Sequence, residues 1–176
     1  LLNAQKGTVY NPYAGTASYL GIIGDNCTYI GQEFFHLSAY VSKLYILING
    51  KGNATIEKRI PDSTLENPNS VYDYVVSTPP FGLRIPNSEY RTADIHYLTH
   101  SSRITRNKSV GIYPASICYN SHSSNRQVLS ELVEEDILDT VILLPTNIFS
   151  NTSIETVIIV VNKNKEHTET VRIIDA

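Results

Sequence analysis

The residues with the clearest chemical potential are Thr78, Pro79, Pro80 and Phe81, which follow a short apolar run at residues 72–76. The two prolines cannot donate backbone hydrogen bonds and have fixed φ angles, so the run is expected to end there as a strand and enter a stiff corner. A hydroxyl, a carbonyl and an aromatic ring then lie just beyond a strand end, which is where ligands bind in open α/β sheets. We therefore expect a small rigid cup at this point.

Such a cup suits the activation of an exocyclic amine on adenine or cytosine, whose nitrogen lone pair is delocalised into the ring. An acceptor on each N–H group draws the nitrogen toward tetrahedral geometry and frees that lone pair. The side-chain oxygen of Thr78 and the carbonyl of Pro79 can supply the two acceptors. The ring of Phe81 can stack on a base that has been extruded from the duplex.

Composition restricts the class of protein. The 176 residues suffice for a single domain with a proper core, and 41% hydrophobic with 18% charged residues is ordinary for a globular chain. A net charge of −3 gives no global basic field for holding DNA, so other segments or subunits would have to supply most phosphate contacts. The two cysteines, Cys27 and Cys118, indicate neither a disulfide framework nor a zinc site. No apolar run reaches membrane-span length. The absence of methionine leads us to expect a fragment of a longer protein, with residues 1–176 forming one domain.

Hydrophobic periodicity predicts strands that alternate with helices. The helix expected at 34–48 has its apolar residues at helical spacing, from Leu37 and Val41 to Leu44 and Ile48. The link between the sixth and seventh strands is too short and too irregular for a parallel crossover, so that pair should be antiparallel. We expect an α/β fold with a mostly parallel seven-stranded sheet and one antiparallel strand, and residues 171–174 can add an edge strand. The expected strands are 7–11, 28–33, 54–60, 72–76, 109–114, 137–144 and 156–161, and the expected helices are 19–23, 34–48, 92–104 and 123–133.

A second candidate site lies after the first strand, where a turn of small residues at 12–18 leads into a brief helix. A ligand can approach such a backbone closely, and the helix start offers free N–H groups, although an ordinary βα turn shows the same pattern. Glu33 ends the second strand 18 residues after Gly15, near the offset at which an acid meets a ribose in nucleotide-binding folds. Asp62 follows the third strand. Its position fits a contact with a ligand and a helix or turn cap equally well.

Two other chemistries are weakly indicated. His96 and His100 have the i, i+4 spacing of metal ligands, but no third ligand stands nearby in the sequence, so a solvated helix face is favoured and no metal site is expected. A Ser/His/Asp hydrolase is a remote option, because the chain has no G-x-S-x-G elbow.

The chain resembles the S-adenosylmethionine-dependent DNA amino-methyltransferases, and most of all the adenine-specific modification subunit of type I restriction-modification systems. The resemblance extends from Thr8 to about Lys165, and the order and spacing of five segments carry it. These segments are 11–16 (NPYAGT), 31–33 (GQE), 62–65 (DSTL), 78–82 (TPPFG) and 144–149 (LPTNIF). The resemblance implies a Rossmann-like methyltransferase fold that transfers a methyl group from S-adenosylmethionine to the N6 amine of adenine in DNA.

The resemblance also implies roles for individual residues. Glu33 would bind the ribose hydroxyls of the cofactor and Asp62 its adenine amine. The cup of Thr78, Pro79, Pro80 and Phe81 would hold the target base. The turn that would hold the amino-acid part of the cofactor contains Asn11, Pro12, Tyr13, Ala14, Gly15 and Ala17. The implied partners are DNA with a flipped adenine, a specificity subunit and a second modification subunit, in the cytoplasm and without a membrane.

Several positions depart from the family pattern. Asn11 stands where such families usually have Asp, and Ala17 and Ser18 stand where Gly is common. Thr78 stands where adenine enzymes usually have Asn or Asp, whereas cytosine-N4 enzymes place Ser there. Two alternatives therefore remain open: a cytosine-N4 methyltransferase, and a degenerate methyltransferase-like domain that serves binding or assembly.

Overall fold

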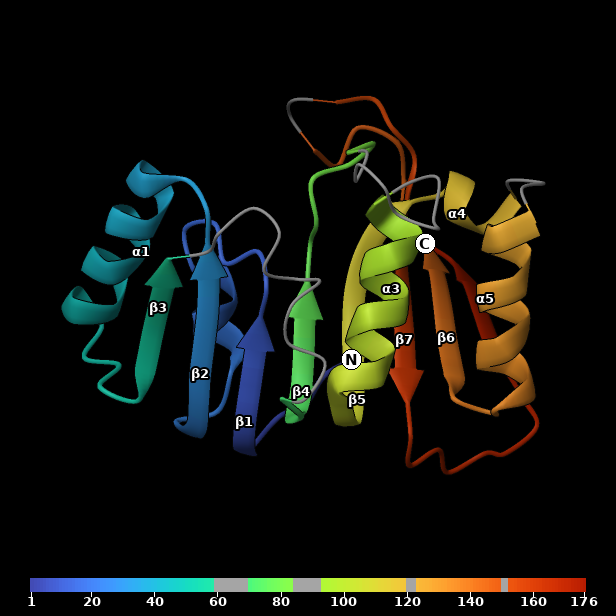
Figure 1. Cartoon of the computed structure of the whole chain (residues 1–176), viewed down its shortest axis with the longest axis horizontal. Coiled ribbons are helices and arrows are strands. Elements are labelled where there is room, and N and C mark those ends of the chain that lie inside the picture. Colours follow the sequence, from blue (N-terminus) through green and yellow to red (C-terminus); the bar gives the residue numbers. More distant parts are fainter. Residues whose placement is uncertain (59–69, 84–92, 120–122, 150–151) are drawn as a thin grey trace.

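The chain folds around one eight-stranded sheet with the strand order β3-β2-β1-β4-β5-β7-β6-β8 (Figure 1). This computed structural model describes residues 1–58, 70–83, 93–119, 123–149 and 152–176. The strands are β1 (Lys6–Asn11), β2 (Asn26–Glu33), β3 (Ala54–Lys58), β4 (Tyr72–Ser77), β5 (Thr105–Pro114), β6 (Leu138–Leu143), β7 (Thr156–Asn162) and β8 (Arg172–Asp175). The helices are the 3-10 helix η1 (Ser18–Ile22), α1 (His36–Ile48), α3 (Ala93–Ile104), α4 (Ser116–Tyr119) and α5 (Ser123–Glu134).

The strand order reverses between β1 and β4. From β1 the chain moves outward to β2 and β3, and then returns to place β4 on the other side of β1. All of these strands are parallel to one another, so their carboxyl ends lie along one edge, at the top of Figure 1. Ligands bind in such folds outside the carboxyl ends of the strands, at the point where the order reverses.

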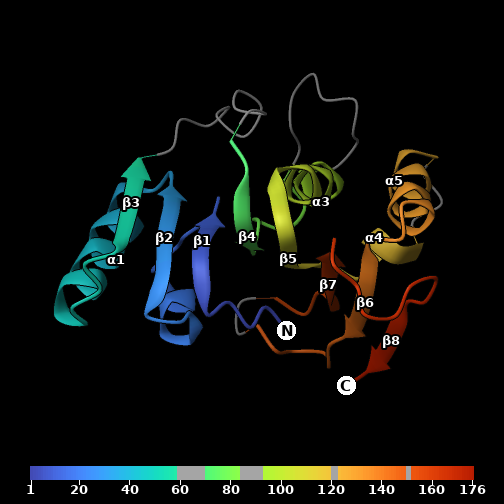
Figure 2. The same ribbon diagram turned by 90° about the horizontal axis from the view of Figure 1, so that it is seen from below.

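Helices cover the sheet on both faces (Figure 2). One apolar cluster joins η1 and α1 to the first strands, with Leu20, Ile46 and Val9 among its buried members. A second joins α3, α4 and α5 to the later strands, through residues such as Leu98, Leu132 and Ile159, and a third, smaller one contains Tyr10, Val75 and Ile104. The central strands β1 and β4 carry buried apolar residues at successive positions and so on both faces, as in parallel sheets, whereas the edge strand β8 is exposed throughout.

A polar clamp joins β1 to β4 near the start of both strands. The Asp73 carboxylate accepts hydrogen bonds from the backbone N–H of Thr8 (2.8 Å) and from its hydroxyl (2.9 Å), and it pairs with Arg106 of β5 at 2.8 Å. Gly7 lies beside this clamp with a φ of +111°, and a Cβ atom there would come within 2.7 Å of the Asp73 carboxylate. The clamp therefore depends on a glycine that leaves room for the acid.

The apolar stripe of α1 faces away from the sheet. Leu37 is 77% exposed, Leu44 is 56% exposed and Ile48 is 82% exposed, whereas Ser42 and Ile46 are buried. The helical spacing predicted the element correctly but did not show which side packs. The opposite side of α1, which carries smaller residues than the exposed stripe, makes the contact with β3 instead.

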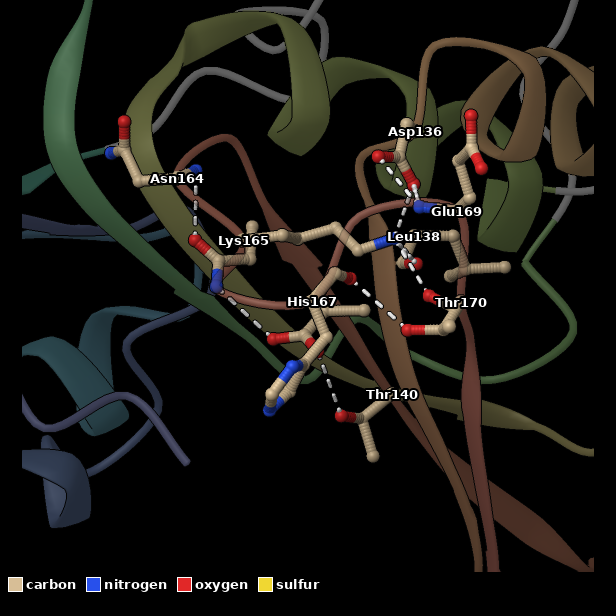
Figure 3. A network of polar contacts seen from close by, with 10 residues as sticks. Asp136, Leu138, Thr140, Asn164, Lys165, His167, Glu169 and Thr170 are labelled. Atoms are coloured by element: carbon tan, nitrogen blue, oxygen red, sulfur yellow. Dashed lines mark hydrogen bonds and ion pairs between the residues drawn. The ribbon is translucent and has the colours of Figure 1, made fainter.

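Lys165 holds the connection that leads to β8 (Figure 3). Its side chain is only 4% exposed, and its ammonium group donates to the Asp136 carboxylate at 2.5 Å and to the Thr170 carbonyl at 2.7 Å. The same carboxylate accepts the backbone N–H of Glu169 at 2.9 Å, and these bonds lower the pKa of Asp136. A buried ammonium needs such partners because desolvation is otherwise costly.

Most expected elements are confirmed, and one feature of the sheet is corrected. The α/β class, the mostly parallel sheet and the antiparallel β6–β7 pair agree with expectation. The sheet has eight strands rather than seven, because residues 172–175 pair in parallel with β6. The weak apolar pattern at 171–174 understated this edge strand, which follows the loop that Lys165 binds. Within the described ranges, no helix is long and apolar enough to span a membrane.

Replacing the clamp acid tests its contribution to stability. The substitution Asp73→Ala leaves the backbone N–H and the hydroxyl of Thr8 without their charged acceptor, so we expect the free energy of unfolding to fall by about 3 kcal/mol. Urea unfolding followed by circular dichroism measures this change. The control Asp175→Ala, on the exposed edge strand, should shift the value by less than about 0.5 kcal/mol. Equal effects of the two substitutions would contradict the clamp.

Candidate functional site

Three strand ends meet where the strand order reverses. Asn11 ends β1, Glu33 ends β2, and Thr78 follows the last residue of β4. Because β1 lies between β2 and β4 and all three are parallel, these residues share one edge of the sheet. The structure thus brings the first turn, the acid after β2 and the double-proline corner together, as the sequence predicts.

The turn after β1 is tied to β2 by its backbone. The N–H of Ala14 donates to the Gln32 carbonyl at 2.9 Å, and the N–H of Gly15 donates to the Glu33 carboxylate at 2.8 Å. Gly15 has a φ of +56°, and a Cβ atom added to it would meet nothing within 4 Å. Open space therefore adjoins the backbone of the turn at its glycine. Ala17 closes the turn with a φ of +61° and precedes η1.

Asn11 is fully buried, and both ends of its amide are used. Its Nδ2 donates to the Tyr29 hydroxyl and its Oδ1 accepts the N–H of Tyr13, each at 3.0 Å. The neutral amide satisfies this site without a buried charge, which a carboxylate would introduce. The ring of Tyr13 packs edge-on against Tyr97 of α3 at 4.8 Å, and Pro12 is buried beside it. Asn11, Pro12 and Tyr13 thus fix the shape of the turn from its buried side.

Glu33 is 8% exposed, and its carboxylate organises two loop segments. One oxygen accepts the N–H of Gly15 and the other accepts the N–H of Phe35, both at 2.8 Å. Each carboxylate oxygen has a second lone pair, so the group can also accept hydroxyl donors from a ligand. An acceptor beside open space at Gly15 has the chemistry that a ribose with two hydroxyls requires.

The double-proline corner contacts the element that follows the first turn. The Thr78 hydroxyl and the Tyr19 hydroxyl of η1 lie 2.5 Å apart. Pro79 is buried and Pro80 is exposed, and the half-buried ring of Phe81 meets Phe149 at 5.5 Å with an interplanar angle of 82°. The predicted cup is therefore adjacent to the predicted cradle, and a second aromatic ring supports Phe81 from the loop after β6.

Three other candidates from the sequence, Asp62, His96 and His100, add no described contact to this site. Asp62 lies outside the described residues. The rings of His96 and His100 stack at 6.2 Å, and both residues are half-buried rather than forming a solvated face. In the part of the chain that the structure describes, no group of three or more His, Cys, Asp or Glu side chains could hold a metal ion.

Comparison with known proteins gives the family. The family model described as N-6 DNA Methylase matches residues 1–176. The chain belongs to that family.

Individual relatives agree with this assignment. The chain is 28% identical over 160 residues to the type I restriction enzyme MjaVII methylase subunit of Methanocaldococcus jannaschii, covering 77% of this chain and 27% of the relative. It is 24% identical over 213 residues to the MpnII methylase subunit of Mycoplasma pneumoniae, covering 95% and 38%. The chain thus spans about a quarter to two fifths of the length of these curated relatives.

A solved structure shows the same fold. The crystal structure of a type I restriction-modification methyltransferase subunit from Streptococcus thermophilus superimposes with a TM-score of 0.84, at 23% identity. The match covers 97% of this N-6 DNA methylase chain and 42% of that one.

Asp94 is a site residue that the sequence reasoning missed. It lies in the first turn of α3 and is 5% exposed, and the backbone N–H of Gly82, directly after the cup, helps to lower the pKa of its carboxyl. The Leu83 carbonyl accepts the N–H of Ala93 at 2.9 Å, so the start of α3 is tied to the backbone that follows the cup. Burial raises the pKa of Asp94 to about 6, against the two hydrogen bonds that lower it. An acid in a first helical turn is so common that sequence alone gave no signal.

The raised pKa makes stability depend on pH with a defined sign. Between about pH 4 and pH 6 the folded chain keeps a proton on Asp94 that the unfolded chain has released, so stability falls as pH rises through this window. Relative to wild type, Asp94→Asn should therefore gain up to about 3 kcal/mol between pH 4 and pH 7. Urea unfolding at several pH values measures this difference.

Asp73→Asn is a control with the opposite sign. The backbone N–H of Thr8 is the main cause that lowers the pKa of Asp73, so the wild-type advantage over this variant should grow as pH rises through the acidic range. A pH-independent difference for Asp94→Asn would contradict the assignment.

Proposed function

We propose that this chain is the catalytic core of a DNA methyltransferase that acts on the N6 amine of adenine in a type I restriction-modification system. The observation that carries the proposal is the 2.5 Å contact between Tyr19 and Thr78, because it joins the cradle after β1 to the cup after β4. Methyl transfer requires a donor and an amine to be held within reach of each other, and proximity supplies much of the rate.

The cofactor in this proposal is S-adenosylmethionine. The open space at Gly15 and the buried Glu33 carboxylate fit a ligand that has an extended backbone-like part and a ribose. Glu33 would accept the ribose hydroxyls, and the amino-acid part would lie on the backbone of the turn formed by Asn11, Pro12, Tyr13, Ala14, Gly15 and Ala17. Asp62 would contact the adenine amine of the cofactor. When bound, S-adenosylmethionine supplies an electrophilic methyl group on a sulfonium sulfur, which keeps the electron pair of the breaking C–S bond.

The cup would hold and activate the target amine. Thr78 Oγ1 and the Pro79 carbonyl would each accept one N–H of the amine, Pro80 would keep the corner stiff, and Phe81 would stack on the flipped base. The nitrogen forms the new bond to carbon and then releases one proton to water. Adenine is favoured over cytosine because the family is that of N-6 DNA methylases.

The proposal includes partners for the whole protein. A net charge of −3 leaves most phosphate contacts to other parts of the assembly, so DNA recognition would come from a specificity subunit, with a second modification subunit present. The assembly would act in the cytoplasm.

Cofactor binding tests the cradle. In the full-length protein, Glu33→Ala should weaken S-adenosylmethionine binding at least about tenfold, because a charged acceptor for two hydroxyls is lost. Isothermal titration calorimetry measures the Kd, and thermal unfolding checks that the variant is folded. The control Glu57→Ala, on exposed β3, should keep the wild-type Kd. No binding by the wild type would instead favour a degenerate domain that serves assembly.

Methyl transfer tests the cup. Thr78→Ala and Phe81→Ala should each lower methylation about a hundredfold while the cofactor Kd stays unchanged, because the ligand that these side chains would contact is the base and not the cofactor. Mass spectrometry of N6-methyladenine in DNA from cells that express the full-length protein with its specificity subunit gives the readout. The control Thr168→Ala lies on an exposed loop and should be fully active. Full activity of the cup variants would refute these roles, and N4-methylcytosine as the product would show that cytosine is the target.

A further inference from the structure

We propose that Tyr19 is a positioning residue that turns the Thr78 hydroxyl into a hydrogen-bond acceptor for the target amine. This inference rests on the proposed function, and it deepens that function by assigning the direction of one hydrogen bond. The two hydroxyl oxygens lie 2.5 Å apart, come from segments 59 residues apart in the sequence, and are partly buried.

The need for such a residue follows from hydroxyl chemistry. A carboxamide or carboxylate oxygen only accepts hydrogen bonds, so Asn or Asp at this position can face an amine N–H without assistance. A threonine hydroxyl carries a proton, which repels an N–H group when it points into the cup. When Thr78 donates that proton to Tyr19, its lone pairs are left for the amine.

The surroundings hold Tyr19 in place for this task. Leu20, the next residue, is buried, and its N–H donates to the Ala17 carbonyl at 3.0 Å, so the start of η1 is fixed to the turn. The ring of Tyr19 packs against the apolar cluster under β1 and β2. Its hydroxyl is thereby held at the rim of the cup, and Tyr19 as a residue is half-buried. When this hydroxyl accepts the Thr78 proton, its own phenolic proton is donated to another acceptor such as water.

A double-mutant cycle tests the direction of the bond. Tyr19→Phe should lower the methylation rate 10- to 100-fold, with the Kd for S-adenosylmethionine unchanged within twofold. In a Thr78→Asn background, where the amide oxygen accepts without help, Tyr19→Phe should change the rate by less than twofold. The control Tyr45→Phe removes a hydroxyl from a side chain packed on the same cluster and should keep the wild-type rate.

Several results would overturn the inference. A Tyr19→Phe enzyme with unchanged or higher activity means that Tyr19 donates to Thr78, and an equal loss in the Thr78→Asn background means that Tyr19 acts independently. A wild type that neither binds the cofactor nor methylates DNA contradicts the proposed function, and this role with it.

A stability cycle tests the contact without any cofactor or DNA. Tyr19→Phe and Thr78→Val, alone and combined, should be non-additive by about fivefold in the unfolding equilibrium constant, because each removes the same hydrogen bond. Additive effects contradict the contact, whatever the outcome for methylation.

Discussion

The parallel pairing of β1 with β4 is the constraint on which the rest of the structure depends. It places the end of the first strand next to the end of the fourth, although 60 residues separate these strands in the chain. Asp73 and Thr8 fix the pairing at its lower end, and the hydroxyls of Tyr19 and Thr78 meet above its upper end. The cradle and the cup are adjacent because the sheet reverses its order here, and no single loop has to bridge them.

Local chemistry explains why much of this arrangement could be predicted from the sequence. A double proline ends any strand, so it predicts the end of β4. The small residues after β1 predict a turn that a ligand can approach. The spacing of Glu33 from Gly15 placed the acid at the correct edge of the sheet. Each of these signals lies within about 20 residues of chain, where propensity and periodicity are informative.

What could not be predicted depends on contacts between distant segments. Asp94 looks like any acid at a helix start, and only the fold shows that it is buried beside the residues that follow Phe81. Tyr19 is one of 12 tyrosines, and nothing in its neighbourhood indicates a partner 59 residues away. The apolar stripe of α1 predicted a helix but not its orientation, and the loop before β8 is held by a lysine whose buried side chain the sequence presents as an ordinary charge.

Gly31 is a position near the site where packing within the fold, and not contact with a ligand, limits which residues can be substituted. It lies near the carboxyl end of β2, and a Cβ atom there would come within 2.9 Å of Ala14 and within 2.6 Å of Ile56. Any larger residue would push the turn after β1 off the sheet, which would displace Gly15 from Glu33. In a mutational scan that scores activity, substitutions at Gly31 would look like those of a residue that takes part in the reaction, although the role of Gly31 is purely steric.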